Sequence, residues 1–323
     1  MILDPAIPLL LLVALALDAG VGDPDWLWRR APHPVVLIGK LISILDQRLN
    51  READTSDARR RSGIAAVAVL LTVCALVGFI AHMLFRLHPV ALIFEIVAVA
   101  VLMAQRSLYD HVARVSSAFR KGGLQEARVA VSMIVGRDPK SLDEAGVCRA
   151  AVETTAENFS DGIVAPAFWY LVGGLPALLA YKALNTADSM IGHRTDRHLA
   201  FGWAAARLDD FANLVPARLS GFILTVASPL VGGRAYSAFA AMMRDARRHR
   251  SPNAGWPEAA MAGAFGLALG GPRRYGTEWV EDAWMNYGGR TEATPADIDQ
   301  GLRLLIAGCA IHAALVAALA FSV

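Results

Sequence analysis

Three short segments in the middle of the chain carry residue types that could bind a metal ion or do acid–base chemistry. The first contains Glu153, Glu157, Asn158 and Asp161 and leads into an uncharged apolar stretch, 162–181. In a helix, its three carboxylates would project from one face at four-residue spacing. Acids beside an apolar segment are costly, and they repel one another unless a cation lies among them. The pattern favours Mg²⁺ held partly through substrate phosphate, and a solvated acidic helix end is the alternative.

The second segment follows the apolar stretch and combines amide, acid, imidazole and guanidinium groups. Asn185 and Asp188 would lie three residues apart on one helix, and His193 and Arg194 follow on a turn. The carboxylate could bind a metal, while Arg194 and Arg197 would hold an anion such as phosphate. His193 is equally well explained as a histidine at the membrane interface without a chemical role.

The third segment repeats this mixture of groups. Asp209 and Asn213 are four residues apart and would share a helix face, with Arg207 and Arg218 on either side. This face is expected to join the earlier acids at one active site. An ordinary surface with ion pairs is the alternative, because the spacing of an acid and an amide is a weak signal by itself.

A basic run, 247–250, precedes a loop rich in turn-forming residues. Arg248 belongs to the run, and Ser251 and Asn253 belong to the loop. A rigid loop beside a guanidinium suits the binding of a substrate anion, whereas the run alone would serve as a positive anchor at the membrane.

The composition indicates an integral membrane protein. Only 19% of the 323 residues are charged and 55% are hydrophobic, whereas about a quarter of the residues in a soluble domain are charged. Stretches 62–85, 87–105 and 304–323 approach the roughly 20 apolar residues of a spanning helix, and 6–17 is a shorter candidate. No run combines strand-like alternation with hairpin turns. We therefore predict an all-α, polytopic integral membrane protein with about four to six membrane segments.

Clusters of Lys and Arg predict the topology. By the positive-inside rule, helical loops at about 29–61, 106–160 and 232–303 lie in the cytoplasm. The whole chain, 1–323, is then one membrane-embedded domain of the cell inner (cytoplasmic) membrane, with an active site that faces the cytoplasm. The net charge of +2 gives no indication of a nucleic-acid partner.

The apolar stretch 162–181 is interrupted by Gly173, Gly174 and Pro176. Such a break suits two half-helices folded back as a re-entrant hairpin, whose exposed backbone is covered by protein. The hairpin would return the chain to the cytoplasmic side and bring the three polar segments together. The alternative is a single crossing, which leaves the polar segments on opposite sides of the membrane.

Taken together, the motifs resemble the membrane family of cobalamin biosynthesis called CobD or CbiB, adenosylcobinamide-phosphate synthase. They cover nearly the whole chain in the same order as in the family. The matching residues are Asp18, Gly22, Asp23, Pro24, Pro32, His33, Pro34, Glu153, Glu157, Asn158, Asp161, Gly162, Asn185, Thr186, Asp188, Ser189, Met190, Ala206, Arg207, Leu208, Asp209, Asp210, Ser251, Pro252, Asn253, Ala254 and Gly255.

The resemblance implies amide-bond synthesis. Members join the propionate carboxylate of a corrinoid, adenosylcobyric acid, to the amine of (R)-1-amino-2-propanol phosphate or aminopropanol, which gives adenosylcobinamide phosphate. ATP is consumed as a co-substrate, and Mg²⁺ is expected. A carboxylate is a poor electrophile, so we expect ATP to convert it to an acyl phosphate before the amine attacks. The chain has no P-loop motif, so any nucleotide site is of another type.

This chemistry assigns roles to the polar residues by inference from their types. The expected metal ligands are Glu157, Asp161, Asp188 and Asp209. The candidates for proton transfer and for holding the transferred group are Glu153, His193, Arg194 and Arg207. The candidates for substrate binding are Asn158, Asn185, Arg218, Arg248, Ser251 and Asn253.

Two other functions are compatible with such a sequence. A membrane transferase would bind a diphosphate substrate through Mg²⁺, and it would need two acidic sets that face one cavity. A corrinoid transporter would use the break near 173–176 as a substrate site at the membrane midplane. The lipid bilayer is a partner in every case, and other cobalamin-pathway enzymes or a second copy of the chain are further candidates.

Overall fold

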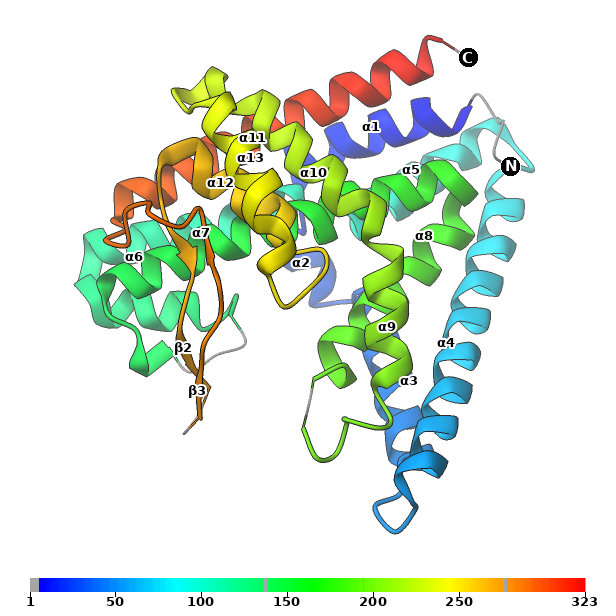
Figure 1. Cartoon of the computed structure of the whole chain (residues 1–323). Coiled ribbons are helices and arrows are strands. Elements are labelled where there is room, and N and C mark those ends of the chain that lie inside the picture. Colours follow the sequence, from blue (N-terminus) through cyan, green and yellow to red (C-terminus); the bar gives the residue numbers. More distant parts are fainter. Residues whose placement is uncertain (1–5, 136–138, 194, 276–277, 323) are drawn as a thin grey trace. The chain divides into compact units, whose positions relative to one another are not determined.

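A computed structural model describes residues 6–135, 139–193, 195–275 and 278–322 of the chain (Figure 1). The chain divides into two compact units. Unit 1 comprises the described residues of Met1–Ala104, Ala165–Asn213 and Val316–Val323, and unit 2 comprises those of Gln105–Val164 and Leu214–Leu315. The expectation of one membrane-embedded domain with cytoplasmic loops stays a prediction.

Unit 1 consists of helices packed around two apolar cores. One core includes Ile42 and Phe201, and the other includes Leu11 and Tyr170. The elements of unit 1 are α1 (Ala6–Val21), α2 (Asp25–Trp28), α3 (Pro34–Leu49), α4 (Ser56–Phe85), the short 3₁₀ helix η1 (Pro89–Ala91), α5 (Leu92–Leu102), α8 (Ala165–Ile191) and α9 (Trp203–Ala212).

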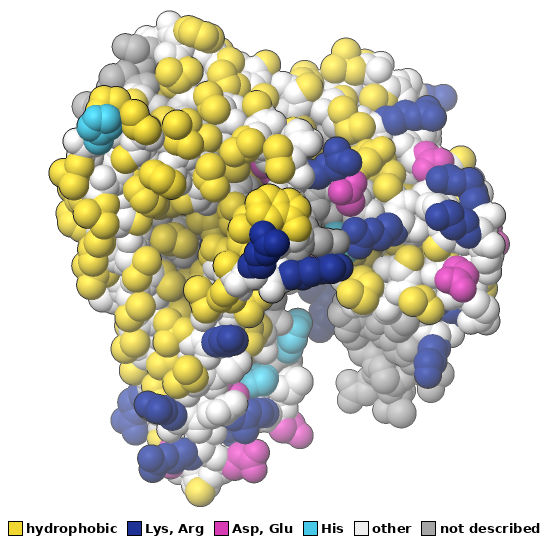
Figure 2. Space-filling model, turned by 180° about the vertical axis from the view of Figure 1, so that it is seen from behind, with side chains coloured by type: hydrophobic (Ala, Val, Ile, Leu, Met, Phe, Trp, Pro, Cys, Tyr) yellow, Lys and Arg dark blue, Asp and Glu magenta, His cyan; other side chains and the backbone are white. Residues whose placement is uncertain are grey.

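The long helix α4 presents an apolar face away from the core. Its 30 residues extend over about 45 Å, and the hydroxyl of Thr55 caps its first turn by accepting from the Ala58 N–H. Leu76 and Leu84 are each 55% exposed. Figure 2 shows hydrophobic side chains over this side of the molecule, with Lys and Arg toward its lower end, where α4 begins. An exposed face of this length suits contact with lipid.

Helix α8 is broken where the sequence predicts a break. Gly173 and Gly174 leave the helical conformation, and Gly174 adopts a φ of 64°, which a residue with a side chain rarely tolerates. The rings of Trp169 and Tyr181 stack with centroids 6.5 Å apart, although 12 residues of straight helix would separate their backbones by about 18 Å. The two halves of α8 therefore bend sharply toward one another, and the re-entrant path through the membrane stays a prediction.

Unit 2 is a second helical assembly around one large core, which includes Val152, Phe159 and Leu224. Its helices are α6 (Gln105–Val131), η2 (Pro139–Ser141), α7 (Glu144–Phe159), the π-helical turn η3 (Ser160–Val164), α10 (Leu214–Ala227), η4 (Ser228–Val231), α11 (Ala235–Asp245), η5 (Ala246–Arg248), α12 (Gly255–Phe265) and most of α13 (Pro295–Ala320). In the described part of this unit, four short strands form two antiparallel pairs, β1 (Leu269–Gly270) with β4 (Trp284–Met285) and β2 (Arg273–Tyr275) with β3 (Glu278–Val280).

The predicted fold class is confirmed. Among the described residues, five helical segments are long and apolar enough to cross a membrane, and α1 is a shorter apolar helix. These segments are Ser56–Phe85, Pro89–Val131, Glu144–Ile191, Leu214–Val231 and Pro295–Ala320. The predicted stretch 87–105 is not one continuous helix, because the backbone of Met103 is extended and separates α5 from α6.

Candidate active site

Asp209 lies within a buried polar cluster that joins α8 to α9. Its side chain is 7% exposed. One carboxylate oxygen accepts from the Asn185 amide at 3.4 Å, and the other accepts from the Asn213 amide at 3.0 Å. The Tyr181 hydroxyl in turn donates to the Asn213 Oδ1 at 2.9 Å. The structure thus brings together Asn185, Asp209 and Asn213, and it adds Tyr181, which was not among the candidate residues.

The environment of Asp209 disfavours its charged form. Burial raises the pKa of its carboxyl, the nearby carboxylate of Asp188 raises it further, and the amides of Asn185 and Asn213 oppose the shift, so that the pKa is about 7. A divalent cation would relieve the repulsion between Asp188 and Asp209. Mg²⁺ is commonly held in proteins by one or two carboxylates together with substrate phosphates, so this pair of carboxylates fits that ion.

The predicted metal ligands divide between the units. Asp188 and Asp209 belong to unit 1, whereas Glu157 and Asp161 belong to unit 2. Within the described part of the chain, no group of three or more His, Cys, Asp or Glu side chains is arranged to hold a metal ion. A site that uses all four carboxylates therefore stays a prediction.

The segment after α8 carries the candidate imidazole. His193 is exposed and interacts electrostatically with Asp188, which is half-buried in the last turn of α8. Arg207 is also exposed, and its guanidinium lies 3.8 Å from the Asp210 carboxylate. Arg194 lies outside the described residues.

A hydrogen-bond network that local sequence does not reveal holds the segment 195–202. The Arg197 guanidinium donates to one carboxylate oxygen of Asp46 at 2.8 and 3.1 Å, and the Asn50 amide donates to the Arg197 carbonyl at 3.0 Å. Arg59 donates to the Asn50 Oδ1 at 2.8 Å. Arg197, considered above as an anion clamp, is thus already engaged with a carboxylate of α3.

In unit 2, the first acidic segment divides between two helical forms. Glu153 is buried, and its carboxylate accepts from the Gly270 N–H at 2.8 Å, so it holds β1 against α7. Glu157 is exposed one turn later, which keeps the predicted four-residue spacing. Asp161 lies in the wider π-helical turn η3, which shifts its position relative to α-helical spacing. Asn158 is half-buried and donates to the Thr154 carbonyl at 3.0 Å.

Arg218, Ser251 and Asn253 are brought together in unit 2. The Arg218 guanidinium donates to the Asn253 Oδ1 at 3.4 Å and lies 4.6 Å from the centroid of the Trp256 ring. The Ser251 hydroxyl accepts from the Asn253 and Ala254 N–H groups at 3.2 and 3.3 Å, which closes the loop before α12. Among the described residues, no carboxylate forms an ion pair with Arg218.

Arg248 has an acidic partner. Its guanidinium lies 3.5 Å from the carboxylate of Asp245, which is fully buried. Asp245 also accepts from the Arg244 guanidinium at 2.6 Å and from the Asn286 N–H at 2.9 Å. Asp245 was not among the predicted site residues, because one acid between two arginines in the sequence is unremarkable.

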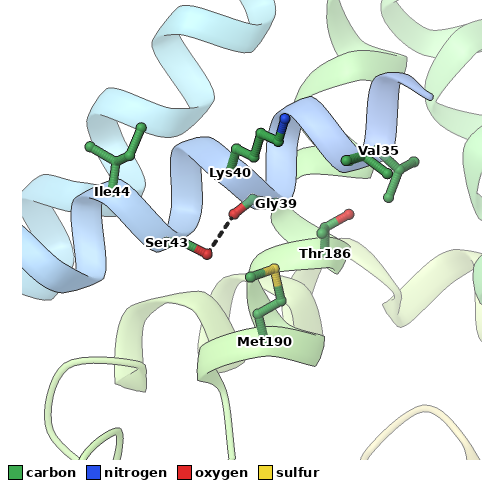
Figure 3. Close-up of a pocket in the computed structure, with 8 residues that line it drawn as sticks. Val35, Gly39, Lys40, Ser43, Ile44, Thr186 and Met190 are labelled. Atoms are coloured by element: carbon green, nitrogen blue, oxygen red, sulfur yellow. Dashed lines mark hydrogen bonds between the residues drawn. The ribbon is translucent and has the colours of Figure 1, made fainter. Parts of the chain in front are cut away.

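An open apolar groove lies between α3 and the second half of α8. It encloses about 610 Å³, and Figure 3 shows Met190 and Thr186 facing α3 across it, with Lys40 on α3. The Cβ of a residue at Gly39 would lie 3.4 Å from the Met190 sulfur, so the glycine allows this close approach. The groove combines an apolar floor with one basic side chain.

The chain is similar to proteins that share one name. A family model described as CobD/Cbib protein matches residues 11–305. Cobalamin biosynthesis protein CobD of Sinorhizobium sp is 54% identical over 321 residues, which cover 98% of this chain and 99% of that protein. The protein of the same name from Brucella suis biovar 1 (strain 1330) is 51% identical over 317 residues, with 95% and 97% covered. That from Rhodobacter capsulatus is 49% identical over 313 residues, with 96% and 97% covered. No solved structure matches the chain.

Proposed function

The chain belongs to the CobD/Cbib protein family, and from this premise we propose that it acts in cobalamin biosynthesis as an adenosylcobinamide-phosphate synthase. It joins the propionate carboxylate of adenosylcobyric acid to the amine of (R)-1-amino-2-propanol phosphate. The observation that carries the proposal is the match over nearly the full length of relatives named for this pathway.

The reaction needs activation of a carboxylate. A propionate oxygen attacks the terminal phosphorus of ATP, and ADP leaves. The amine nitrogen then attacks the acyl carbon, the bond to the phosphate oxygen breaks, and the nitrogen loses one proton. The products are the amide, ADP and inorganic phosphate. This sequence requires groups that hold phosphate, a divalent cation and an acceptor for the proton.

The proposed Mg²⁺ ligands of unit 1 are Asp188 and Asp209. In unit 2, the sequence alone suggests Glu157 and Asp161 as further ligands. Support comes from the raised pKa of Asp209, because a carboxyl poised near neutrality binds a cation with loss of a proton. Asn185 and Asn213 orient both oxygens of Asp209. When bound, Mg²⁺ supplies charge neutralisation for the phosphate oxygens of ATP.

Arg218 is the proposed phosphate clamp of unit 2. Its guanidinium is oriented by Asn253 and Trp256, yet no described carboxylate neutralises it. A cation that is fixed before the ligand arrives binds an anion with little reorganisation. Arg248 is a weaker candidate, because Asp245 already lies 3.5 Å away.

Of the two candidate proton acceptors, the contacts favour His193. A carboxylate oxygen of Glu153 accepts a backbone N–H, and the side chain is only 6% exposed. His193 is exposed and lies near Asp188, so its ring nitrogens are open to a proton from the substrate amine. His193→Gln should therefore lower turnover more than Glu153→Gln once both variants are shown to be folded.

The reaction is tested with purified protein in detergent. Adenosylcobyric acid, aminopropanol phosphate and Mg-ATP are mixed with the protein, and the corrinoid product is identified by its mass. The proposal predicts a product heavier than the acid by the aminoalcohol phosphate less one water, formed with stoichiometric ADP. Unchanged corrinoid in a preparation that is folded and monodisperse would refute it.

A further inference from the structure

A carboxylate is buried inside unit 1, away from the candidate site. Glu95 on α5 is 0% exposed and is the only charged residue in the stretch 87–105. Its Oε1 accepts from the Tyr170 hydroxyl at 2.8 Å and lies 3.0 Å from the His82 Nδ1, and its Oε2 accepts from the Arg86 Nε at 3.3 Å. A carboxylate in an apolar interior is tolerated only when such partners satisfy it.

These partners join three helices at one point. His82 and Arg86 come from the end of α4, Glu95 comes from α5, and Tyr170 comes from the first half of α8. Figure 1 shows the end of α4 and the start of α5 close to α8. Neither α5 nor α8 can therefore move against α4 without breaking a hydrogen bond to a buried carboxylate.

The network adjoins the break in α8. Tyr170 precedes the non-helical Gly173 by three residues, and the His82 ring lies 3.6 Å from the position of a Cβ at Gly174. At Gly78 a Cβ would be only 2.7 Å from the Pro176 Cα, so α4 packs directly on the backbone beyond the break. The direction in which α8 continues is set here by contacts with α4.

The second half of α8 carries the polar cluster described above. Tyr181, Asn185 and Asp188 all follow the break, and two of them bond to the cluster around Asp209. A rotation at Gly173 and Gly174 would displace these side chains together, because the helix beyond the break moves as one body. The geometry of the break and the geometry of the cluster are thus linked through the backbone.

We propose that Glu95 is a positioning residue for the candidate active site. By binding Tyr170 and His82 it fixes the bend of α8 at Gly173 and Gly174, and so fixes where Asn185 and Asp188 lie. It does not touch substrate. The activity readout of this proposal rests on the proposed function, but its structural readout does not.

The test is a distance measurement in the full-length protein reconstituted in nanodiscs. The native cysteines Cys74, Cys148 and Cys309 are replaced, and spin labels are attached at Leu84 on α4 and at Ser189 on α8, both exposed. Pulsed dipolar spectroscopy then gives the distribution of distances between the labels. Glu95→Leu is compared with Glu95→Gln, which keeps an oxygen that accepts from Tyr170, and with Val67→Ala, a core-loosening control on α4.

The proposal predicts that Glu95→Leu broadens or shifts the distribution, while Glu95→Gln and Val67→Ala keep the wild-type distribution. Turnover should follow the same order, with a loss of roughly tenfold or more in kcat for Glu95→Leu, little change in KM, and recovery in Glu95→Gln.

If Glu95→Leu does not fold, Tyr170→Phe, which removes one hydroxyl, replaces it and should broaden the distribution. Wild-type distances in the folded Glu95→Leu or Tyr170→Phe variant would overturn the proposal. A wild-type protein that forms no product would instead refute the proposed function and leave the distance result standing.

Discussion

Asp209 on α9 accepts a hydrogen bond from Asn185 on α8, across 24 residues of sequence, at 3.4 Å. This contact joins two of the three polar segments that the sequence analysis selected. Because the carboxyl is also buried and lies near Asp188, its pKa rises to about 7. Burial and the neighbouring Asp188 disfavour the charged form of Asp209 when no metal ion is bound. The same two negative groups would favour a bound cation.

Asp209 should make stability depend on pH in the absence of divalent metal. Its pKa is raised from the ordinary range of an aspartate to about 7, so the folded state binds a proton that the unfolded state has lost. Its contribution to stability is therefore complete below about pH 4 and is lost as the pH rises through 7. Asp209→Asn should remove this dependence. Thermal unfolding of both proteins between pH 4 and 8, in EDTA, measures the difference, and parallel curves would contradict the expectation.

Mg²⁺ should reverse the loss of stability at pH 8 in the wild type. The ion binds the folded state and pairs with the ionised Asp188 and Asp209. We expect a higher melting temperature with millimolar Mg²⁺, and no such rise in Asp188→Asn or Asp209→Asn. Glu52→Gln serves as a control, because Glu52 is an exposed carboxylate of the same unit. An equal rise in all four proteins would point to a non-specific salt effect.

Turnover should depend strongly on Asp188. Asp188→Asn keeps the size of the side chain and removes the charge, so we expect kcat to fall by on the order of 100-fold. Asp54→Asn, at an exposed turn outside the cluster, should leave turnover unchanged. The measurement is the initial rate of product formation at saturating Mg-ATP. Wild-type turnover in Asp188→Asn would exclude this carboxylate from the metal site.

Asp46 should hold the segment that carries His193. Burial opposes ionisation of its carboxyl, but hydrogen bonds from Asn50 and Arg197 outweigh it and lower the pKa of Asp46. This contribution to stability is present above about pH 4 and is lost as the pH falls through the lowered pKa. Asp46→Ala should cost about 1–3 kcal/mol at pH 7, because it leaves partners of Asp46 unsatisfied. Chemical denaturation at pH 7 and at pH 3 checks this, and the cost should shrink at pH 3.

Gly78 should tolerate no side chain. A Cβ there would lie 2.7 Å from the Pro176 Cα and 2.8 Å from the Leu175 carbonyl oxygen, and both are backbone atoms that cannot rotate away. We expect Gly78→Ala to destabilise the protein by about 1–3 kcal/mol and to lower turnover. Gly20→Ala, where a Cβ meets nothing within 4 Å, is the matched control. Equal melting temperatures for the two variants would contradict this packing.

Local patterns predicted the features that depend on local sequence. The sequence predicts the uncharged stretch 62–85 of α4, the break at Gly173 and Gly174, and the shared helix face of Asp209 and Asn213. Each of these depends on a local property, namely helix length, glycine freedom or the helical repeat. Glu95 was visible as a lone charge in an apolar stretch, but its role depends on partners from other helices.

Contacts between residues far apart in the sequence could not be predicted from local patterns. Asp46 and Arg197 are separated by 151 residues, and nothing in either local sequence selects the other. The π-helical turn at 160–164 arises in a segment whose residues also suit an α-helix, so the position of Asp161 could not be predicted. Tyr181 carries no charge and was read as the end of an apolar run, although its hydroxyl completes the polar cluster.

The most direct test of the proposed chemistry follows the oxygen atoms of the propionate. Adenosylcobyric acid labelled with ¹⁸O in that carboxylate is converted with Mg-ATP and aminopropanol phosphate, and the inorganic phosphate is analysed by mass. Activation as an acyl phosphate predicts one ¹⁸O in each phosphate released and one in the amide. Label in AMP, or product formed with unlabelled phosphate, would contradict the account.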